Sequence, residues 1–389
     1  MESRPVTAAM HVLTLTPFYP TTQDDANGCF VAEPLSALAS LGVRNSVVVG
    51  QPFYRESAKL HSAAPSAKFV RYFSLPSGAG LPTAGAFLLA RILGQIRELH
   101  LSHKIDVIHA HGPLPCGHAA MLLSRELKIP YVVTVHGLDA YSTRQVSGRA
   151  GEWCRRVSAR VFRSAGRVIC ISEHVREQVF AGSKNAATAV VYNGVDAERF
   201  SPAAKEAGGP PSLLSVGNLI PIKGHGVLLR AMSAIASAHP ELKLEIVGDG
   251  PERAGLVRLA CELGLVDRVR FWGRMPRQEV ARFLRECTVF VLPSRYEALG
   301  CVYLEAMATG KVAIGCEGQG IEEVIRHGSN GWLVAPESTE QLAAAMSTLL
   351  AHTMLRRYIG EQARHTILNG FTLAQQAEQL LRVYRESHA

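Results

Sequence analysis

The chain has 389 residues, of which 47% are hydrophobic, a length and composition that predict two or three folded domains. Its 41 basic and 33 acidic residues leave a formal net charge of +8, which favours an anionic partner without distinguishing phosphate, membrane surface and nucleic acid. The eight cysteines form no CxxC pair and no zinc-like spacing, so we expect reduced thiols packed as small hydrophobic groups.

A membrane-spanning segment is not expected. The best apolar candidate, residues 81–96, is interrupted by Arg91 and stays below the roughly 18 residues that a span requires. The first 20 residues lack the charged segment, apolar core and small-residue cleavage site of a secretory signal. We therefore predict a cytoplasmic protein.

Short β-rich runs alternate with longer helical patterns along the whole chain. Such alternation is typical of parallel sheets built from strand-helix-strand units, and it predicts an α/β fold. In the first half the predicted strands lie in residues 11–16, 45–50, 68–73, 105–111, 131–137, 167–172 and 189–195. In the second half they lie in residues 213–219, 242–250, 268–273, 288–294 and 311–316.

A histidine cluster can be drawn from the first half. His109 and His111 alternate on one face of a predicted strand end, and His118 and His136 could join them around a metal ion. A metal-dependent hydrolase needs further ligands at successive strand ends of one closed barrel, whereas this chain divides into two halves. No D-x-D triplet occurs either. We therefore predict that no metal is required.

A basic segment follows. Six arginines fall between Arg149 and Arg167, with Trp153 and apolar residues interleaved as in an amphipathic helix. A solvated basic face is the first interpretation, and contact with an anionic membrane is the second. Nucleic-acid binding ranks below both and is not expected, because no recognition module accompanies the charge.

The composition changes at residues 201–211, which are rich in proline and glycine and predict a linker. We place the domain boundary there, with an N-terminal domain over residues 1–205 and a second domain over residues 206–370. Two open α/β domains that face one another would form a cleft at the carboxyl ends of their strands, where ligands bind in such sheets.

The most informative segment is residues 288–314, which predicts a strand, a loop, a helix and another strand. Glu297 lies in the loop, the helix is expected to begin near Leu299 or Gly300, and Glu305 lies within it. Unpaired amides at a helix start attract anions such as a pyrophosphate. One carboxylate could then face sugar hydroxyls and the other a ribose.

This segment, PSRYEALG…LEAMATGK, is followed by GCEGQGIEEVI and HGSNGWLV, and the ordered set resembles the donor-binding half of the retaining glycosyltransferases of family 4. The resemblance implies the GT-B fold, in which two Rossmann-like domains face a cleft, and a last helix over residues 371–389 that crosses back to the first domain. The Gly-rich run 315–320 is not expected to be a dinucleotide fingerprint, because its spacing differs and a true fingerprint belongs in the first strand-turn-helix of its domain.

The family pattern extends to other positions in the second half. Lys223, in the loop after a strand, resembles a lysine that offsets charge on the leaving phosphate. Asn218 stands where the family has an arginine, so it offers a hydrogen bond without charge. Arg274 and Met275 match a turn whose backbone would read a base edge, although a plain surface turn remains the alternative.

In the first half, His136 resembles the histidine of the family's T-x-H-G-x-D turn beside the transferred sugar, with a structural turn histidine as the alternative. Gly28 lies between the first strand and its helix, where a side chain would block the approach of donor or acceptor. It could equally be a turn or helix-cap glycine.

The resemblance implies a retaining, metal-independent hexosyltransferase whose co-substrate is a nucleotide-diphosphate-sugar and which needs no other cofactor. His136, Glu297 and Lys223 are the expected catalytic residues. The acceptor would be a glycan or lipid-linked hydroxyl, as in exopolysaccharide, teichuronic-acid or lipid-linked oligosaccharide assembly at the inner face of the plasma membrane. The alternatives are a nucleotide-sugar epimerase or phosphorylase on the same fold, the metal-dependent hydrolase, and a non-catalytic basic adaptor on membranes.

Overall fold

The computed structural model describes residues 10–55, 67–76, 78–141, 146–204 and 208–388, which form two compact units. The first unit runs to Tyr192 and takes in the segment from Ala374 onward, and the second unit is Asn193–Leu373. Residues 1–9, which are part of the segment on which the expectation of no signal segment rests, lie outside the described residues.

The units divide earlier in the chain than the sequence predicts. The expected boundary between residues 205 and 206 lies outside the described residues, but residues 193–200 already belong to the second unit. Val195 forms a bridge with Thr372, and Phe200 is fully buried. In addition, Arg285 Nη1 donates to the carbonyl of Arg199 at 3.0 Å. These contacts hold the segment against the second unit although its sequence contains no linker-like composition until residue 201.

The first unit is built on one parallel sheet of seven strands in the order β3-β2-β1-β4-β5-β6-β7. Valine and isoleucine runs make these strands apolar on both faces, as parallel strands between two helix layers require. Each strand coincides with a predicted run. The strands are β1 (His11–Thr16), β2 (Arg44–Pro52), β3 (Ala67–Tyr72), β4 (Val107–His111), β5 (Tyr131–Val135), β6 (Arg167–Cys170) and β7 (Thr188–Val190).

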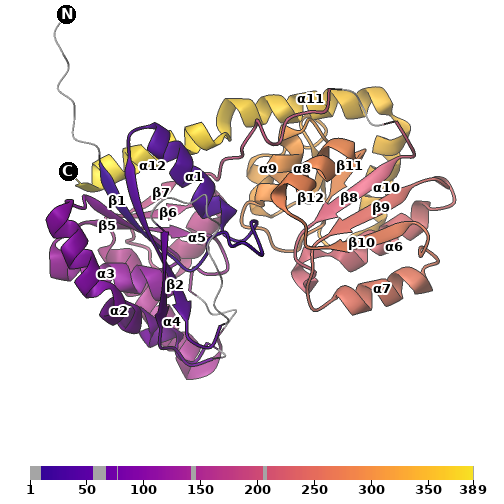
Figure 1. The fold of residues 1–389 in the computed structure, drawn as a ribbon. Coiled ribbons are helices and arrows are strands. Elements are labelled where there is room, and N and C mark those ends of the chain that lie inside the picture. The colour runs from indigo at the N-terminus through magenta and orange to yellow at the C-terminus, as the bar shows by residue number, and fades with distance from the viewer. Residues whose placement is uncertain (1–9, 56–66, 77, 142–145, 205–207, 389) are drawn as a thin grey trace, which may run out of the picture. The chain divides into compact units, whose positions relative to one another are not determined.

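Helices cover both faces of this sheet (Figure 1). Crossovers in opposite directions along a parallel sheet put their helices on opposite faces, because each crossover is right-handed. Helices α1 (Cys29–Ser40) and α12 (Leu373–His388) share one apolar cluster with the sheet. The other layer consists of α2 (Leu81–Ser102), the short turn η1 (Pro113–Gly117), α3 (His118–Leu127), α4 (Gly148–Ser164) and α5 (Glu173–Gly182).

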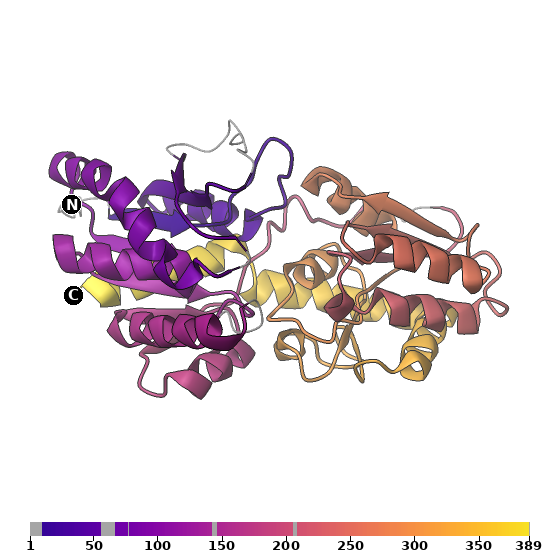
Figure 2. The same ribbon diagram turned by 90° about the horizontal axis from the view of Figure 1, so that it is seen from below.

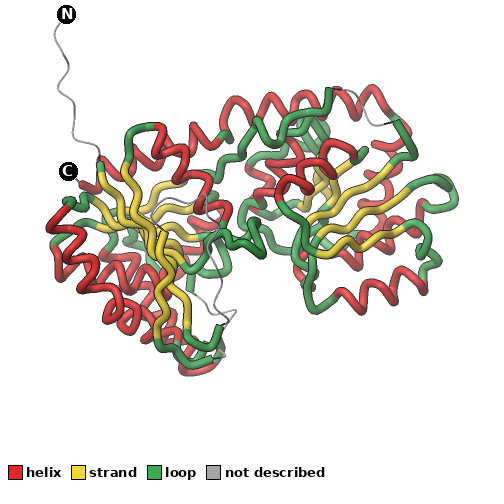
Figure 3. Tube along the Cα trace, viewed as in Figure 1, coloured by secondary structure: helices red, strands yellow, loops and turns green. Residues whose placement is uncertain are grey.

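The second unit repeats this plan on a parallel sheet of six strands in the order β10-β9-β8-β11-β12-β13. Its helices, red in Figure 3, flank the yellow strands of this sheet. The strands are β8 (Ser212–Val216), β9 (Lys243–Val247), β10 (Val269–Gly273), β11 (Val289–Val291), β12 (Ala313–Cys316) and β13 (Trp332–Val334). The helices and helical turns are η2 (Pro221–Lys223), α6 (His225–Ile235), α7 (Arg253–Glu262), α8 (Arg277–Glu286), α9 (Cys301–Ala308), η3 (Gly320–Glu323), α10 (Thr339–Ala351) and α11 (Thr353–Gly370).

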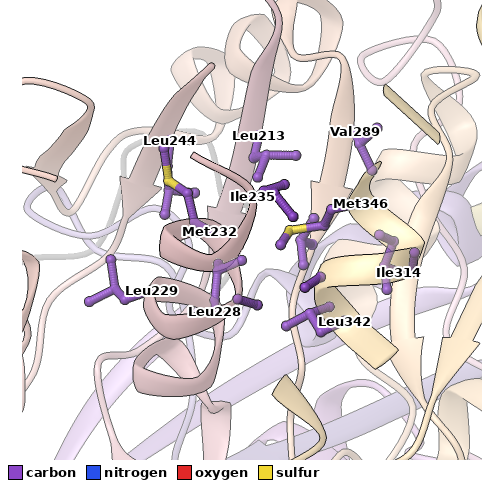
Figure 4. Packing of buried hydrophobic residues seen from close by; sticks show 14 of the residues in the cluster. Leu213, Leu228, Leu229, Met232, Ile235, Leu244, Val289, Ile314, Leu342 and Met346 are labelled. Atoms are coloured by element: carbon purple, nitrogen blue, oxygen red, sulfur yellow. The ribbon is translucent and has the colours of Figure 1, made fainter. Parts of the chain in front are cut away.

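The core of the second unit lies between its sheet and α6, α7 and α10. Leu213, Leu244 and Ile314 from the strands face Met232 and Met346 from the helices, as Figure 4 shows. All five side chains are fully buried. This packing fixes β8 beside β11 and therefore also fixes the loops that follow these two strands.

In each unit the strand order reverses at one place, between β1 and β4 in the first and between β8 and β11 in the second. Open parallel sheets bind ligands outside the carboxyl ends of their strands at such a switch point. The topology alone therefore predicts a ligand site at the loops after these four strands. Figure 2 shows both units from a second direction. Among the described residues no helix is both long enough and apolar enough to cross a bilayer.

Candidate functional site

The loop between β11 and α9 carries Glu297. Helix α9 begins at Cys301, slightly later than predicted, because Gly300 adopts a left-handed conformation with φ of 84°. A Cβ on Gly300 would lie 2.5 Å from Tyr303 Cδ2 and 2.8 Å from Glu297 Cγ. The loop can therefore fold back over Glu297 only with glycine at this position. The side chain of Leu299 is fully buried, so only its backbone could meet a ligand.

The backbone of Glu297 is held by the Gly-rich loop after β12. The Glu297 amide donates to Gln319 Oε1 at 3.0 Å, and the Gly320 amide donates to the Glu297 carbonyl at 2.9 Å. A Cβ on Gly320 would lie 1.9 Å from the carbonyl oxygen of Ala298. Residues 315–320 thus position the carboxylate loop, which fits the expectation that they are not a dinucleotide fingerprint.

Lys223 forms an ion pair with Glu297, with Nζ 2.5 Å from Oε2. The two side chains are only 17% and 11% exposed, so each charge is largely shielded from water. The Arg295 amide also donates to the carbonyl of Ile222 at 2.8 Å, which joins the same two loops. The switch point of the second unit therefore brings together two residues that the sequence predicts separately, and their pairing is not foreseen there.

Glu305 lies in α9 and is paired with Arg277, the first residue of α8. Arg277 Nη1 lies 2.8 Å from Glu305 Oε1, and the two side chains are 10% and 6% exposed. The guanidinium also lies over the ring of Phe200, 5.1 Å from its centroid. Sequence reasoning misses Arg277, since an arginine at a helix start carries no signal until its buried partner is known.

The remaining predicted residues of the second unit lie in its loops. Asn218 follows β8 and is exposed, and its carbonyl accepts a hydrogen bond from the Ile220 amide at 2.9 Å. Arg274 is exposed and Met275 is half-buried, in the turn between β10 and α8. The backbone of Asn218 thus shapes the turn that leads to Lys223, and the roles expected for the other two residues stay predictions.

In the first unit, the carboxyl ends of β4, a switch-point strand, and of its neighbour β5 carry imidazoles in contact with one another. His136 follows β5 and His111 ends β4, with His136 Nε2 3.0 Å from His111 Nδ1 and nearly parallel rings. His109 also contacts His111, with ring centroids 4.3 Å apart and ring planes tilted by 34°. Its Nδ1 lies 2.7 Å from the hydroxyl of Tyr384, and its Nε2 lies 2.6 Å from Thr134 Oγ1.

Burial decides the charge of these imidazoles. It lowers the pKa of His136 to about 4 and that of His109 to about 3, and it holds the pKa of His111 well below its ordinary value. All three rings are therefore neutral at pH 7, and in each ring one nitrogen donates while the other accepts. The pair of His111 and His136 can be satisfied only when one ring donates to the other.

Asp139 supports the loop that carries His136. Its Oδ1 accepts a hydrogen bond from the His136 amide at 2.9 Å. Its Oδ2 is buried and has no hydrogen-bond partner. Burial is the main cause that raises the pKa of Asp139 to about 6. The predicted H-G-x-D turn is thus a closed local structure in which the carboxyl group fixes the backbone of the histidine.

The histidines of the first unit are held by hydrogen bonds. Both nitrogens of His109 already have hydrogen-bond partners, in Tyr384 and Thr134. Within the described part of the chain, no group of three or more histidine, cysteine, aspartate or glutamate side chains is arranged to hold a metal ion. The arrangement suits hydrogen bonding by neutral rings.

Gly28 caps the start of α1 with φ of 74°. A Cβ there would lie 2.5 Å from both the carbonyl carbon of Phe18 and the amide nitrogen of Tyr19. The glycine is therefore required by the chain's own backbone, which supports the helix-cap interpretation left open by the sequence. The rings of Phe18, in the loop before Gly28, and of Phe30, in α1, pack against His136.

The chain is similar to known proteins. Residues 196–366 match the family described as Glycosyl transferases group 1, and residues 30–199 match Glycosyltransferase Family 4. An uncharacterized glycosyltransferase of Methanocaldococcus jannaschii is 30% identical over 263 residues, which cover 68% of this chain and 70% of that protein. Glycogen synthase of Mycobacterium tuberculosis is 30% identical over 287 residues, covering 73% and 69%. The chain belongs to the group 1 glycosyltransferases, with a family 4 N-terminal region, and is itself a glycosyltransferase.

Solved structures resemble the whole chain. Sucrose-phosphate synthase from Thermosynechococcus elongatus has a TM-score of 0.78 at 23% identity, covering 97% of this chain and 98% of the other. HepE of Anabaena in complex with UDP-glucose has a TM-score of 0.73 at 20% identity, covering 97% and 99%. These likenesses confirm the predicted GT-B fold of two Rossmann-like domains with parallel sheets.

Proposed function

We propose that this glycosyltransferase moves a hexose, with retention of configuration, from a nucleotide-diphosphate-sugar to a hydroxyl group of a glycan or lipid-linked acceptor. The observation that carries the proposal is the shielded pair of Lys223 and Glu297 at the switch point of the second unit. A lysine and a carboxylate at one strand edge suit a donor that carries a diphosphate and a sugar. HepE of Anabaena, one of the structural neighbours, forms a complex with UDP-glucose, which supports this class of donor.

The ion pair suggests how donor binding could prepare the site. A diphosphate carries more negative charge than one carboxylate, so it competes with Glu297 for Lys223. Binding would draw Lys223 to the phosphates and leave Glu297 to orient the sugar and support positive charge at its anomeric carbon. The first amides of α9, which lack partners within the helix, would add to phosphate binding and offset the neutral Asn218.

The chemical step breaks the bond between the anomeric carbon and the phosphate oxygen, and the electron pair leaves with the diphosphate. The acceptor oxygen bonds to the same face of the sugar, and its proton passes to the departing phosphate oxygen. Glu305 would hold the ribose hydroxyls, and neutral His136 would donate a hydrogen bond to the sugar. We propose that no metal takes part, because Lys223 and the helix amides supply the stabilisation.

The biological setting is part of the proposal. Relatives of this chain include enzymes named glycogen synthase and D-inositol 3-phosphate glycosyltransferase, so the family spans polymeric and small acceptors. The basic segment of α4 favours an acceptor presented at an anionic membrane, in exopolysaccharide, teichuronic-acid or lipid-linked glycan assembly.

Thermal shift against UDP-, GDP- and ADP-sugars in the presence of chelator tests the donor. A ligand that binds only the folded state raises the melting temperature, so one donor should do so in wild-type protein and not in Lys223→Met. Lys243→Met is the matched control, because Lys243 is the first residue of β9 and so lies at the amino ends of the strands, whereas Lys223 follows the carboxyl end of β8. NMR of the product should then show the donor's anomeric configuration. No shift with any donor, an inverted product, or isomerised or phosphorolysed sugar would overturn the proposal.

A further inference from the structure

Helix α4 has one apolar face and one strongly basic face. Its buried residues include Cys154, Val157, Val161 and Phe162, which face the first unit's interior. Arginines 149, 156, 160 and 163 follow one another at spacings of seven, four and three residues, so they lie along the opposite side of the helix. The sequence leaves open whether this face is merely solvated or contacts a membrane.

The arginines line a defined groove. It has a volume of about 410 Å³ and lies between α4 and residues 182–185, at the end of α5. Its basic lining consists of Arg155, Arg156, Arg160, Arg163 and Lys184, and no acidic side chain lines it. We call it the α4 basic groove. Its volume falls within the range of small-ligand sites, and guanidinium groups bind phosphate oxygens in pairs.

Nearby carboxylates neutralise only part of this charge. Glu152 pairs with Arg155 at 2.8 Å and with Arg156 at 2.9 Å. For Arg160, Arg163 and Lys184, no carboxylate among the described residues lies within 4.0 Å. Five cations and one adjacent carboxylate leave a local charge of 5 − 1 = +4. Such a concentration of like charges favours an anionic partner.

An exposed aromatic side chain lies beside the arginine row. Trp153 is 50% exposed, and it precedes Arg156 by three residues and Arg160 by seven, so it flanks the same row. A free phosphate would leave this indole in water. A membrane surface would satisfy both features, because tryptophan prefers the headgroup region and arginine binds the phosphates there.

We propose that the α4 basic groove binds the phosphate groups of anionic phospholipids and thereby holds the first unit on a membrane surface. This inference deepens the membrane contact of the proposed function and does not depend on the donor. Each basic residue near an anionic surface contributes about 1 kcal/mol, so the loss of two corresponds to a roughly thirty-fold weaker partition.

Sedimentation with vesicles tests the groove. Wild-type protein should sediment with phosphatidylcholine and phosphatidylglycerol in equal parts, but not with phosphatidylcholine alone. Arg160→Glu/Arg163→Glu should weaken the partition at least roughly thirty-fold. Arg382→Glu/Arg385→Glu is the matched control, because both residues are exposed on α12 and the change in net charge is the same. Near-wild-type binding by the control supports the groove, and an equal loss in both variants would overturn it.

Two further readouts separate lipid binding at the groove from capture of free phosphate. Tryptophan fluorescence should shift to the blue on adding the anionic vesicles, and Trp153→Phe should remove most of that shift. Titration with glycerol 1-phosphate should show no saturable binding. Saturable binding of this phosphate without vesicle binding would overturn the lipid assignment. Arg160→Glu/Arg163→Glu should keep the wild-type thermal shift with the donor. If wild-type protein binds vesicles but no donor, the proposed reaction fails and the groove stands.

Discussion

The switch points of the two units share a topology and differ in chemistry. In the first unit three neighbouring imidazoles are kept neutral by burial, while in the second unit the buried carboxylates of Glu297 and Glu305 are each paired with a cation. A neutral imidazole can give a hydrogen bond without attracting an anion, whereas a lysine can compensate a leaving diphosphate. The same strand order therefore supports two roles, neutral hydrogen bonding and charge compensation. The side chains at the strand ends determine which role each unit has.

Substitutions at the charged switch point of the second unit should reduce turnover more than substitutions at the neutral switch point of the first unit. Glu297→Gln should lower kcat by about 10² to 10³, because the neutral amide cannot support positive charge at the anomeric carbon. The donor-induced thermal shift should remain, since Lys223 is retained. Glu337→Gln is the control, because Glu337 has a 63% exposed side chain and pairs with Arg295 away from this carboxylate. Unchanged turnover in Glu297→Gln would refute the role of Glu297.

Substitutions in the buried pair of Arg277 and Glu305 should have the next largest effect. Arg277→Met removes the guanidinium that compensates the buried Glu305 carboxylate and should destabilise folding by about 3 kcal/mol in chemical denaturation. Arg277→Met/Glu305→Gln should recover much of this loss, because the uncompensated charge is gone. If Glu305 holds the ribose, Glu305→Gln should also reduce the preference for UDP-glucose over dTDP-glucose, which lacks the 2′-hydroxyl. An unchanged preference would count against that role.

The neutral switch point should respond more weakly. His136→Ala should lower kcat/KM about ten-fold, the cost of one neutral hydrogen bond to the sugar. His136→Gln should retain more activity than His136→Ala, since glutamine also donates a hydrogen bond without charge. Steady-state kinetics of both variants would show the difference. Equal losses would indicate that the histidine acts through its charge or its ring packing.

The stability of the first unit should also change with pH. The pKa of His136 is lowered to about 4 and that of His109 to about 3, so the unfolded chain, with ordinary values near 6.5, binds more protons as the pH falls through this window. Stability from the neutral rings is present above pH 6.5 and is lost progressively below it. The pKa of Asp139 is raised to about 6, so this group contributes a change in stability of the opposite sign. The three imidazoles, whose pKa values are all lowered, outweigh this single carboxyl group. The melting temperature should fall on acidification, and less steeply in His111→Asn. Parallel curves would be incompatible with this assignment.

Much of the fold follows from local sequence. The valine- and isoleucine-rich runs predict every strand of both sheets up to β12, and β13 lies in the HGSNGWLV segment that belongs to the family resemblance. The predicted unit boundary falls too late, because residues 193–200 are held by contacts to distant residues and carry no proline or glycine cluster. The predicted start of α9 falls slightly early, because a left-handed glycine can end a loop or begin a helix.

The pairings at the candidate site could not be predicted in the same way. Lys223 and Glu297 meet only because β8 lies beside β11, and strand order is a property of the folded sheet. Arg277 meets Glu305 because α8 and α9 pack together. A sequence motif indicates which residues are chemically suited to a site, while their partners depend on which strands and helices become neighbours.

The proposed reaction requires the second unit to bind a nucleotide-diphosphate-sugar at the carboxyl ends of β8 and β11. A crystal structure with the donor selected by thermal shift would decide whether it does. We expect diphosphate oxygens within hydrogen-bond distance of Lys223 Nζ, with the ribose at Glu305 and the Lys223–Glu297 pair opened. Donor bound elsewhere, or bound with that ion pair intact, would refute this mode of binding.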